Sequence, residues 1–226
     1  MHVLGELVFT HDPYLAEIGT LWLLQYRLAS NIDEATAWYF FFNEFSMREF
    51  THDNFVTALQ NFIKMTDDGD VARRSLDDDF QCIVNTYLPR RKTDGKNFSP
   101  ENNIVCPFAE LGLIDVLNGR EKIFRKKCPP IDALNPLVAL AVIVDNAGGR
   151  KEISLTELLR SPKNVGRVFN LDSIVLLDVL RKLERRQLVK INRTAGLDVL
   201  SLRRELTFAD CVEKFYASLD GRDFDT

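Results

Sequence analysis

The sequence predicts a mainly α-helical protein with short β-hairpins, built from tandem winged-helix-like units. In each half, three helical patterns precede two short segments that flank a turn. Prolines between the halves interrupt regular structure, since proline fits neither a helix interior nor a central strand. The first predicted unit, residues 1–130, is aromatic-rich and helical and ends in a wing-like hairpin. The second, residues 131–226, is winged-helix-like and carries a C-terminal helix.

The opening block combines a turn with an unusual density of aromatic residues. Asp12-Pro13 predicts a turn, so that a helix begins near Gly19 or Thr20. Both tryptophans follow this turn. In one segment the aromatic residues recur at helical spacing, which favours a buried stripe in the core over a platform for base stacking. Any of these aromatic residues left exposed would favour a homodimer. The residues at helical spacing are Trp38, Phe41, Phe42 and Phe45.

The rest of the first unit resembles a winged helix in element order. Alternating segments flank Asn118-Gly119, the dipeptide that most favours a type I′ turn. The polar, basic segment 89–107 is expected to be an exposed loop. Helices are expected at 33–45, 51–65 and 70–88, and strands at 112–117 and 121–125.

The second unit repeats this order after a linker at about 128–135. Its third helix is strongly amphipathic, and Arg193 to Gly196 separate two alternating segments. Helices are expected at 136–147, 154–160, 172–186 and 206–219, and strands at 188–192 and 197–202.

Composition limits the classes of function. The 226 residues are 46% hydrophobic and carry a formal net charge of −4, so any DNA contact must come from local basic patches. No apolar run approaches the roughly 20 residues that cross a bilayer, which favours a cytoplasmic location without membrane contact. The cysteines are far apart and form no C-x-x-C pair, so we expect reduced thiols and no zinc. They are Cys82, Cys106, Cys128 and Cys211.

Basic clusters are the candidate DNA-binding residues. They lie on the loop after the third helix, at the end of the first wing, at the end of the second unit's third helix and at the tip of its wing. A solvated loop or a cation stabilising a helix C-terminus explains the same residues without DNA. The candidates are Arg90, Arg91, Lys92, Arg125, Lys126, Lys127, Arg185, Arg186 and Arg193.

The acidic residues do not specify an active site. Asp77-Asp78-Asp79 suggests a divalent cation, but adjacent residues on a helix point about 100° apart, which favours a structural role for Asp79. Glu121 and Lys122 would lie on opposite faces of a strand, unlike the carboxylate and lysine of a restriction-type nuclease. The sequence contains no phosphate-binding glycine motif. No catalytic residue, metal ligand or cofactor is therefore assigned.

Several motifs, in order along the chain, resemble the bacterial family catalogued as domain of unknown function four thousand and seven. The resemblance implies a role in DNA phosphorothioation and anti-phage defence, because such proteins look like the B component of Ssp-type systems, which is thought to nick DNA. It also implies that the protein works with sulfur-transfer and ATPase components. Nicking would require Mg²⁺ or Mn²⁺. Family members usually begin with a further segment containing a helix-turn-helix pattern, so the chain is expected to be truncated or a short member. The motifs are Asp12-Pro13-Tyr14, Gly19 to Leu24, Trp38 to Asn43, Asp79 with Cys82 and Tyr87, Cys106 to Ile114, Gly166 to Leu171, and Thr194 to Leu197.

Three functions remain compatible with the sequence. The first is a DNA-binding component that also nicks DNA, which the resemblance favours. The second is a winged-helix regulator or DNA-binding adaptor without catalysis. The third is a protein-interaction scaffold, suggested by the acidic net charge and the apolar third helix of the second unit.

Overall fold

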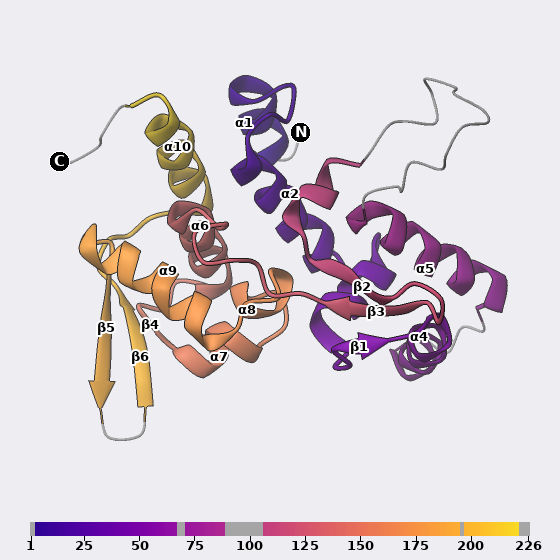
Figure 1. The fold of residues 1–226 in the computed structure, drawn as a ribbon. Helices are drawn as coiled ribbons and strands as arrows, with labels where there is room; N and C mark the ends of the chain where they lie inside the picture. The colour runs from indigo at the N-terminus through magenta and orange to yellow at the C-terminus, as the bar shows by residue number, and fades with distance from the viewer. Residues whose placement is uncertain (1–2, 67–70, 89–105, 195–196, 222–226) are drawn as a thin grey trace. The chain divides into compact units, whose positions relative to one another are not determined.

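The computed structural model describes residues 3–66, 71–88, 106–194 and 197–221, and it is mainly helical with small antiparallel sheets, as predicted (Figure 1). The chain forms two compact units. Unit 1 comprises Met1–Ser30 and Cys128–Thr226, and unit 2 comprises Asn31–Lys127. The predicted boundary between the two units lies at residue 130, and in the structure the chain passes between the compact units near residues 30 and 128.

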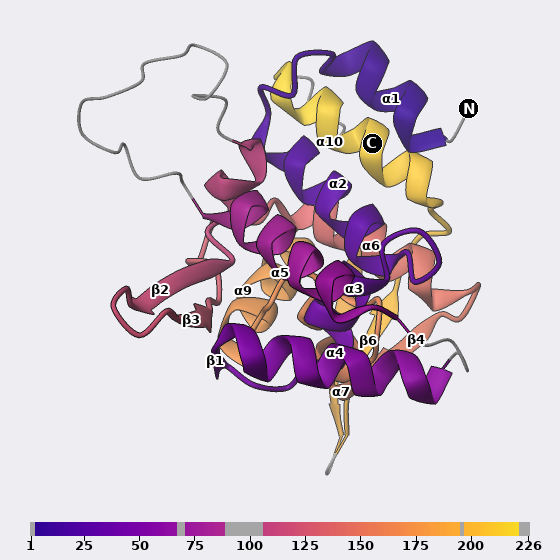
Figure 2. The same cartoon turned by 90° about the vertical axis from the view of Figure 1, so that its right-hand side faces the viewer.

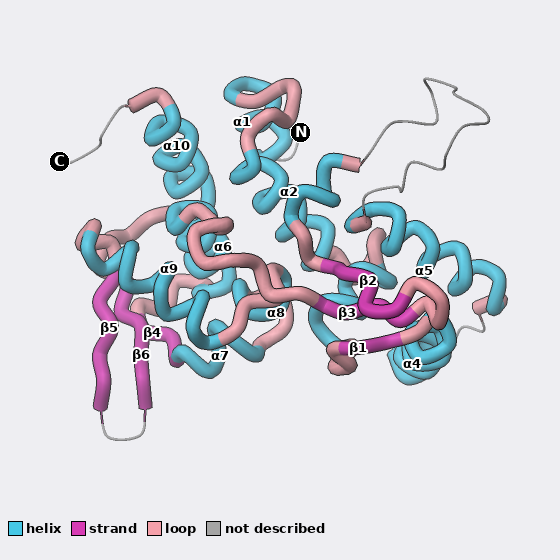
Figure 3. The backbone as a smooth tube through the Cα atoms, in the orientation of Figure 1, coloured by secondary structure: helices cyan, strands magenta, loops and turns pink. Residues whose placement is uncertain are grey.

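Unit 2 combines helices with a three-stranded sheet. The strand order is β1-β3-β2, and both pairings are antiparallel (Figure 3). The first helix changes from α to π geometry at Phe40, and α4 and α5 pack against each other. The elements are α3 (Thr36–Tyr39), the π-helix η1 (Phe40–Glu44), β1 (Glu49–Phe50), α4 (His52–Thr66), α5 (Arg73–Tyr87), the 3-10 helix η3 (Pro107–Leu111), β2 (Ile114–Asn118) and β3 (Ile123–Lys126).

The hairpin of unit 2 differs from the predicted two-residue turn. Asn118 still belongs to β2 and pairs with Ile123, so residues 119–122 form the connection. The Asn118 side chain accepts hydrogen bonds from the backbone N–H groups of Arg120 and Glu121, at 3.0 and 3.2 Å. Lys122 has a left-handed φ of 52°. Asparagine therefore organises a longer turn through its side chain, and Glu121 and Lys122 lie in that turn rather than on a strand.

Phenylalanines form most of the core of unit 2. Phe41 and Phe42 pack edge to face at 5.0 Å between ring centroids, and Phe41 contacts Phe50 in the same way at 5.4 Å. All three rings, and that of Phe55, are fully buried. The prediction of a core stripe is thus confirmed for the phenylalanines, while Trp38 is half-buried.

Unit 1 combines the N-terminal helices with the C-terminal half of the chain. Its sheet has the order β4-β6-β5, with both pairings antiparallel. Figure 2 shows α1 beside α10. The sequence analysis did not identify α1, β4 or α8. The elements are α1 (Val3–His11), α2 (Ile18–Ser30), α6 (Pro136–Ala147), β4 (Glu152–Ser154), α7 (Leu155–Arg160), α8 (Val165–Val168), α9 (Ser173–Arg185), β5 (Val189–Thr194), β6 (Leu197–Leu202) and α10 (Phe208–Leu219).

Side-chain caps explain where the predicted helices of unit 1 begin. Asn135 accepts a hydrogen bond from the backbone of Leu137 at the start of α6. Asp172 accepts two such bonds at the start of α9, and Thr207 forms a capping box with Asp210 in α10. These short polar side chains satisfy N–H groups that have no partner within the helix, so local sequence sets these helix starts.

Residues 1–30 belong to unit 1, where C-terminal elements hold α2 in place. The Thr20 hydroxyl lies 2.9 Å from the Tyr216 hydroxyl, and Gln25 donates to the Val168 carbonyl at 3.0 Å. Tyr26 donates to Asp145 at 2.6 Å. All three contacts join residues more than 100 positions apart, so local patterns did not reveal this grouping.

Candidate nucleic-acid interface

The predicted basic loop cannot be placed. Arg90, Arg91 and Lys92 lie in 89–105, outside the described residues. Arg193 lies in β5, with its backbone opposite Asp198, and its side chain is also outside the described part.

Two basic residues at the β2–β3 hairpin of unit 2 have different environments. Arg125 lies opposite Asp115 in the β2–β3 ladder, and its guanidinium contacts that carboxylate at 3.1 Å. Lys127 follows β3 and is exposed, while its backbone N–H donates to the Leu113 carbonyl at 2.9 Å. Part of the Arg125 charge is therefore compensated, and Lys127 remains accessible to an anion.

Lys126 turns into the core of unit 2. Its ammonium donates to the carbonyl of Phe45 at 2.6 Å and to that of Phe41. The same group lies 4.5 Å from the centroid of the Phe41 ring and 5.3 Å from that of Phe45. Carbonyls at a helix end have no intrahelical partner, and aromatic faces attract cations. This geometry gives Lys126 a structural role at the end of η1.

The outward face of α9 is poorly suited to reading bases. Ile174 is 68% exposed near its start. One turn later, Asp178 pairs with Lys182 at 2.7 Å, and Lys182 also pairs with Asp132. An apolar side chain and a cation held between two carboxylates offer little to DNA.

A group of exposed cations in unit 1 lies at the end of α9, near the start of β5 and directly after β6. The Arg203 N–H donates to the Leu188 carbonyl at 3.0 Å, which brings the segment after β6 next to the end of α9. Lys190 lies opposite Ser201 in the hairpin. We call these five exposed residues the α9–β6 basic cluster: Arg185, Arg186, Lys190, Arg203 and Arg204.

The sequence analysis identified only Arg185 and Arg186 of this cluster. The Arg203-Arg204 pair directly follows a predicted strand, and that position was an available signal. No hydrogen bond or ion pair of these four guanidinium groups is found among the described residues, whereas Arg27, Arg125 and Arg150 contact carboxylates.

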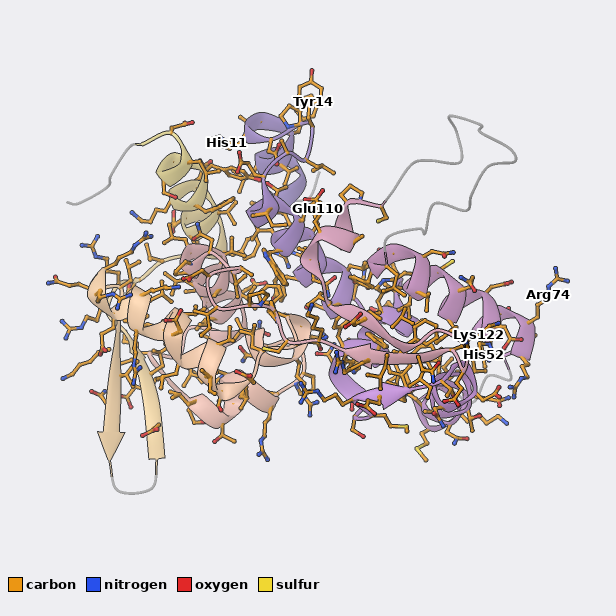
Figure 4. The ribbon with its side chains drawn as sticks, viewed as in Figure 1. His11, Tyr14, His52, Arg74, Glu110 and Lys122 are labelled. Carbon is orange, nitrogen blue, oxygen red and sulfur yellow. The ribbon has the colours of Figure 1, made fainter. Side chains whose placement is uncertain are left out.

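The acidic triplet of α5 divides among separate environments. Asp77 contacts the Nε2 atom of His52 at 3.0 Å, and Asp53 lies 3.3 Å from its Nδ1 atom. Figure 4 places His52 in the body of unit 2 and Arg74 pointing outward from the start of α5. Asp78 is exposed. Within the described ranges, no group of three or more metal-binding side chains is close enough to hold an ion.

Asp79 is half-buried, and no partner of its carboxylate is found among the described residues, so no contact there supports the structural role that the sequence favoured. Burial, and to a lesser degree the Asp78 carboxylate, raise the pKa of Asp79 above its ordinary value. A raised pKa means that ionisation of the Asp79 carboxyl disfavours the folded state. The neutral carboxyl therefore contributes stability below the pKa that Asp79 has in the unfolded state, and this contribution is lost as the pH rises through its pKa in the folded state.

Asp79→Asn is therefore expected to raise the melting temperature slightly at pH 7, because the amide removes the buried charge. The gain should disappear near pH 3, where the wild-type carboxyl is protonated. Thermal unfolding followed by circular dichroism at both pH values measures the effect, with exposed Asp78→Asn as the control. A lower melting temperature at pH 7 in Asp79→Asn alone would show that the carboxylate makes a stabilising contact.

The cysteines form no disulfide among the described residues. All four cysteines are free, and burial raises the pKa of Cys211 to about 12, which keeps its thiol protonated and unreactive. Among the described helices, none is long and apolar enough to cross a membrane.

Comparison with known families identifies the chain. The model of the family described as protein of unknown function (DUF4007) matches residues 1–216. The chain belongs to the DUF4007 family. A search of the curated proteins found no match.

Two solved structures share the DUF4007 fold seen here. One is described as a magnesium ion-bound SspB crystal structure, with 24% identity and a TM-score of 0.78, and the other as an SspB crystal structure, with 21% identity and a TM-score of 0.75. Each match covers 94% of this chain but 63% of the solved chain. This DUF4007 chain thus spans less than two thirds of the proteins that it resembles.

Proposed function

We propose that this DUF4007 protein is a DNA-binding component of a bacterial DNA phosphorothioation system that acts in anti-phage defence. Its family membership and its likeness to SspB support this assignment. The observation that carries the DNA-binding part is the α9–β6 basic cluster, which concentrates exposed cations on a protein with a formal net charge of −4.

Element order supports a winged-helix-like assignment for both units. In each unit, a helix and a short strand precede further helices and a hairpin, and the last strand lies between the other two. In unit 1, α9 would then be the third helix and β5–β6 the wing. The exposed face of α9 carries apolar Ile174 and the ion-paired Lys182, with Arg181 as a further exposed cation, and the cluster is proposed to contact phosphates rather than base edges.

The double charge reversal Arg185→Glu/Arg186→Glu is expected to weaken binding to a labelled DNA duplex at least about 10-fold near 100 mM salt. Loss of two phosphate contacts should also reduce the slope of log K against log salt by about 2. Fluorescence anisotropy across a salt series measures both effects.

The matched control is Arg160→Glu, an exposed arginine of α7 in the same unit. If DNA binding by the control is weakened equally, the effect comes from the overall charge of the protein and not from the α9–β6 basic cluster. Binding by the double variant equal to that of the wild type would remove the cluster from the interface, and no duplex binding by the wild type would favour the scaffold.

We also propose that the protein nicks DNA. The family likeness and the magnesium ion in one SspB structure support this activity. Supercoiled plasmid incubated with Mg²⁺ or Mn²⁺ should give open-circle product that EDTA prevents. Loss of that product in Asp79→Asn would assign Asp79 to catalysis. Salt-sensitive binding without nicking would instead support a DNA-binding adaptor.

Protein partners are proposed to be the sulfur-transfer and ATPase components of the same system. Exposed Ile174 on α9 offers an apolar contact for such a partner. Two aromatic side chains near the start of the chain are exposed, Phe9 at 76% and Tyr14 at 91%, and Tyr14 points outward in Figure 4. These two side chains support the proposal of a homodimer.

A further inference from the structure

Unit 1 contains a pocket beside the α9–β6 basic cluster. Its volume is about 570 Å³, within the roughly 300–1,000 Å³ of small-molecule sites. The end of α6, the turn that precedes β4 and the segment from β6 into α10 line it. The charged lining residues are Asp145, Arg150, Lys151, Arg203, Arg204 and Glu205.

The lining is electropositive. Four cations face two carboxylates, which gives the pocket a formal charge of +2 on a protein whose net charge is −4. Both carboxylates already have partners. Asp145 accepts from the Tyr26 hydroxyl at 2.6 Å and from Arg27 at 3.2 Å, and Glu205 pairs with Lys151 at 3.0 Å.

The three arginines that line the pocket differ in whether their guanidinium groups are available to bind a ligand. Arg150 makes a bidentate contact with Glu157 at 2.5 and 3.0 Å and also donates to the Ala147 carbonyl, so its guanidinium is held in place. Arg203 and Arg204 are exposed, and neither guanidinium has a hydrogen bond or ion pair among the described residues. Both residues line the pocket, and an arginine guanidinium binds phosphate through paired N–H donors.

The backbone at the start of α10 contributes less. Thr207 lines the pocket, but its side chain and that of Asp210 form the capping box and occupy first-turn N–H groups. An anion in this pocket must therefore be bound chiefly by side chains.

We infer that this pocket binds a single phosphate group, with Arg203 and Arg204 as the principal ligands. The inference rests on the proposed DNA-binding function for the source of that phosphate, which is either the terminal phosphate of a strand or a phosphodiester of the DNA backbone. It also assigns separate tasks within the basic cluster. Arg185 and Arg186 contact the duplex, while Arg203 and Arg204 hold one phosphate in the pocket.

Inorganic phosphate tests the pocket without DNA. It is expected to raise the melting temperature of the wild type above that measured in chloride at equal ionic strength and pH, because a ligand that binds only the folded state stabilises it. Arg203→Gln/Arg204→Gln should lose this shift, and Arg160→Gln should retain it. Calorimetric titration with phosphate is expected to show at least about 10-fold weaker binding by the double variant. Far-ultraviolet circular dichroism confirms that the double variant is folded.

Oligonucleotides that differ only in a 5′-phosphate or 5′-hydroxyl then identify the source. At least about 10-fold tighter wild-type binding of the phosphorylated strand, lost in Arg203→Gln/Arg204→Gln, would indicate a terminal phosphate. Equal binding of both strands, weakened to the same degree by that variant, would indicate a backbone phosphodiester.

The outcomes separate this inference from the proposed function. No shift beyond matched chloride, or an equal shift in Arg203→Gln/Arg204→Gln, overturns the pocket even if the duplex still binds in a salt-sensitive manner. A phosphate shift that depends on these arginines supports the pocket, and failure of the wild type to bind duplex DNA in that case overturns only the proposed function.

Discussion

Gly166→Ala is expected to destabilise unit 1 by about 3 kcal/mol or more. A Cβ atom at Gly166 would lie 2.2 Å from the carbonyl oxygen of Leu159 and 2.5 Å from its Cα. Both are backbone atoms of α7, so α7 or α8 would have to move as a whole. Unlike a flexible side chain, packed backbone cannot yield by a change of rotamer.

Chemical denaturation followed by circular dichroism measures this loss as a lower midpoint. The matched control is Gly5→Ala in α1, where an added Cβ would meet no atom within 4 Å. Since alanine favours a helix over glycine by about 0.5–1 kcal/mol, the control should be neutral or slightly stabilised. An unchanged midpoint in Gly166→Ala would mean that the two segments are not in close contact.

Lys126→Met is expected to destabilise unit 2 by about 2–4 kcal/mol. Methionine retains the length and the apolar stem of lysine but leaves the carbonyls of Phe41 and Phe45 without their charged donor. It also removes the cation from the faces of two phenylalanine rings. Thermal and urea unfolding should both show the loss.

Lys127→Met is the neighbouring control. Lys127 is exposed, and substitutions at such sites usually change stability by less than about 0.5 kcal/mol. The pair also tests the DNA prediction for this wing, because the accessible lysine is the one expected to influence salt-dependent binding. Equal stability of the two variants would contradict the structural role of Lys126.

Most regular elements of this fold were predictable from local sequence. Asn135, Asp172 and Thr207 cap helices within a few residues of the predicted starts, since capping acts over two or three positions. The short elements β4 and α8 escaped prediction because three or four residues do not establish a period. The predicted turn at Asn118 failed because its side chain stabilises a longer connection.

The candidate site was less predictable than the fold. Lys126 and Lys127 are indistinguishable as adjacent lysines, yet one binds carbonyls of residues 81 and 85 positions away and the other is exposed. Arg203 and Arg204 acquired significance only when the tertiary structure placed them next to the end of α9 and in the pocket with Arg150. A run of basic residues shows where positive charge lies along the sequence, whereas the packing of distant segments decides which groups each cation contacts.

The sequence by itself determined the helical character, the caps, both hairpins and the family, because these depend on neighbouring residues or on motifs in order along the chain. Only the tertiary structure decided that residues 1–30 group with the C-terminal half, that Gly166 must lack a side chain, and which cations remain available to an anion. The physical reason is the same in each case: contacts between residues far apart in the chain decide them, and no local pattern encodes such contacts.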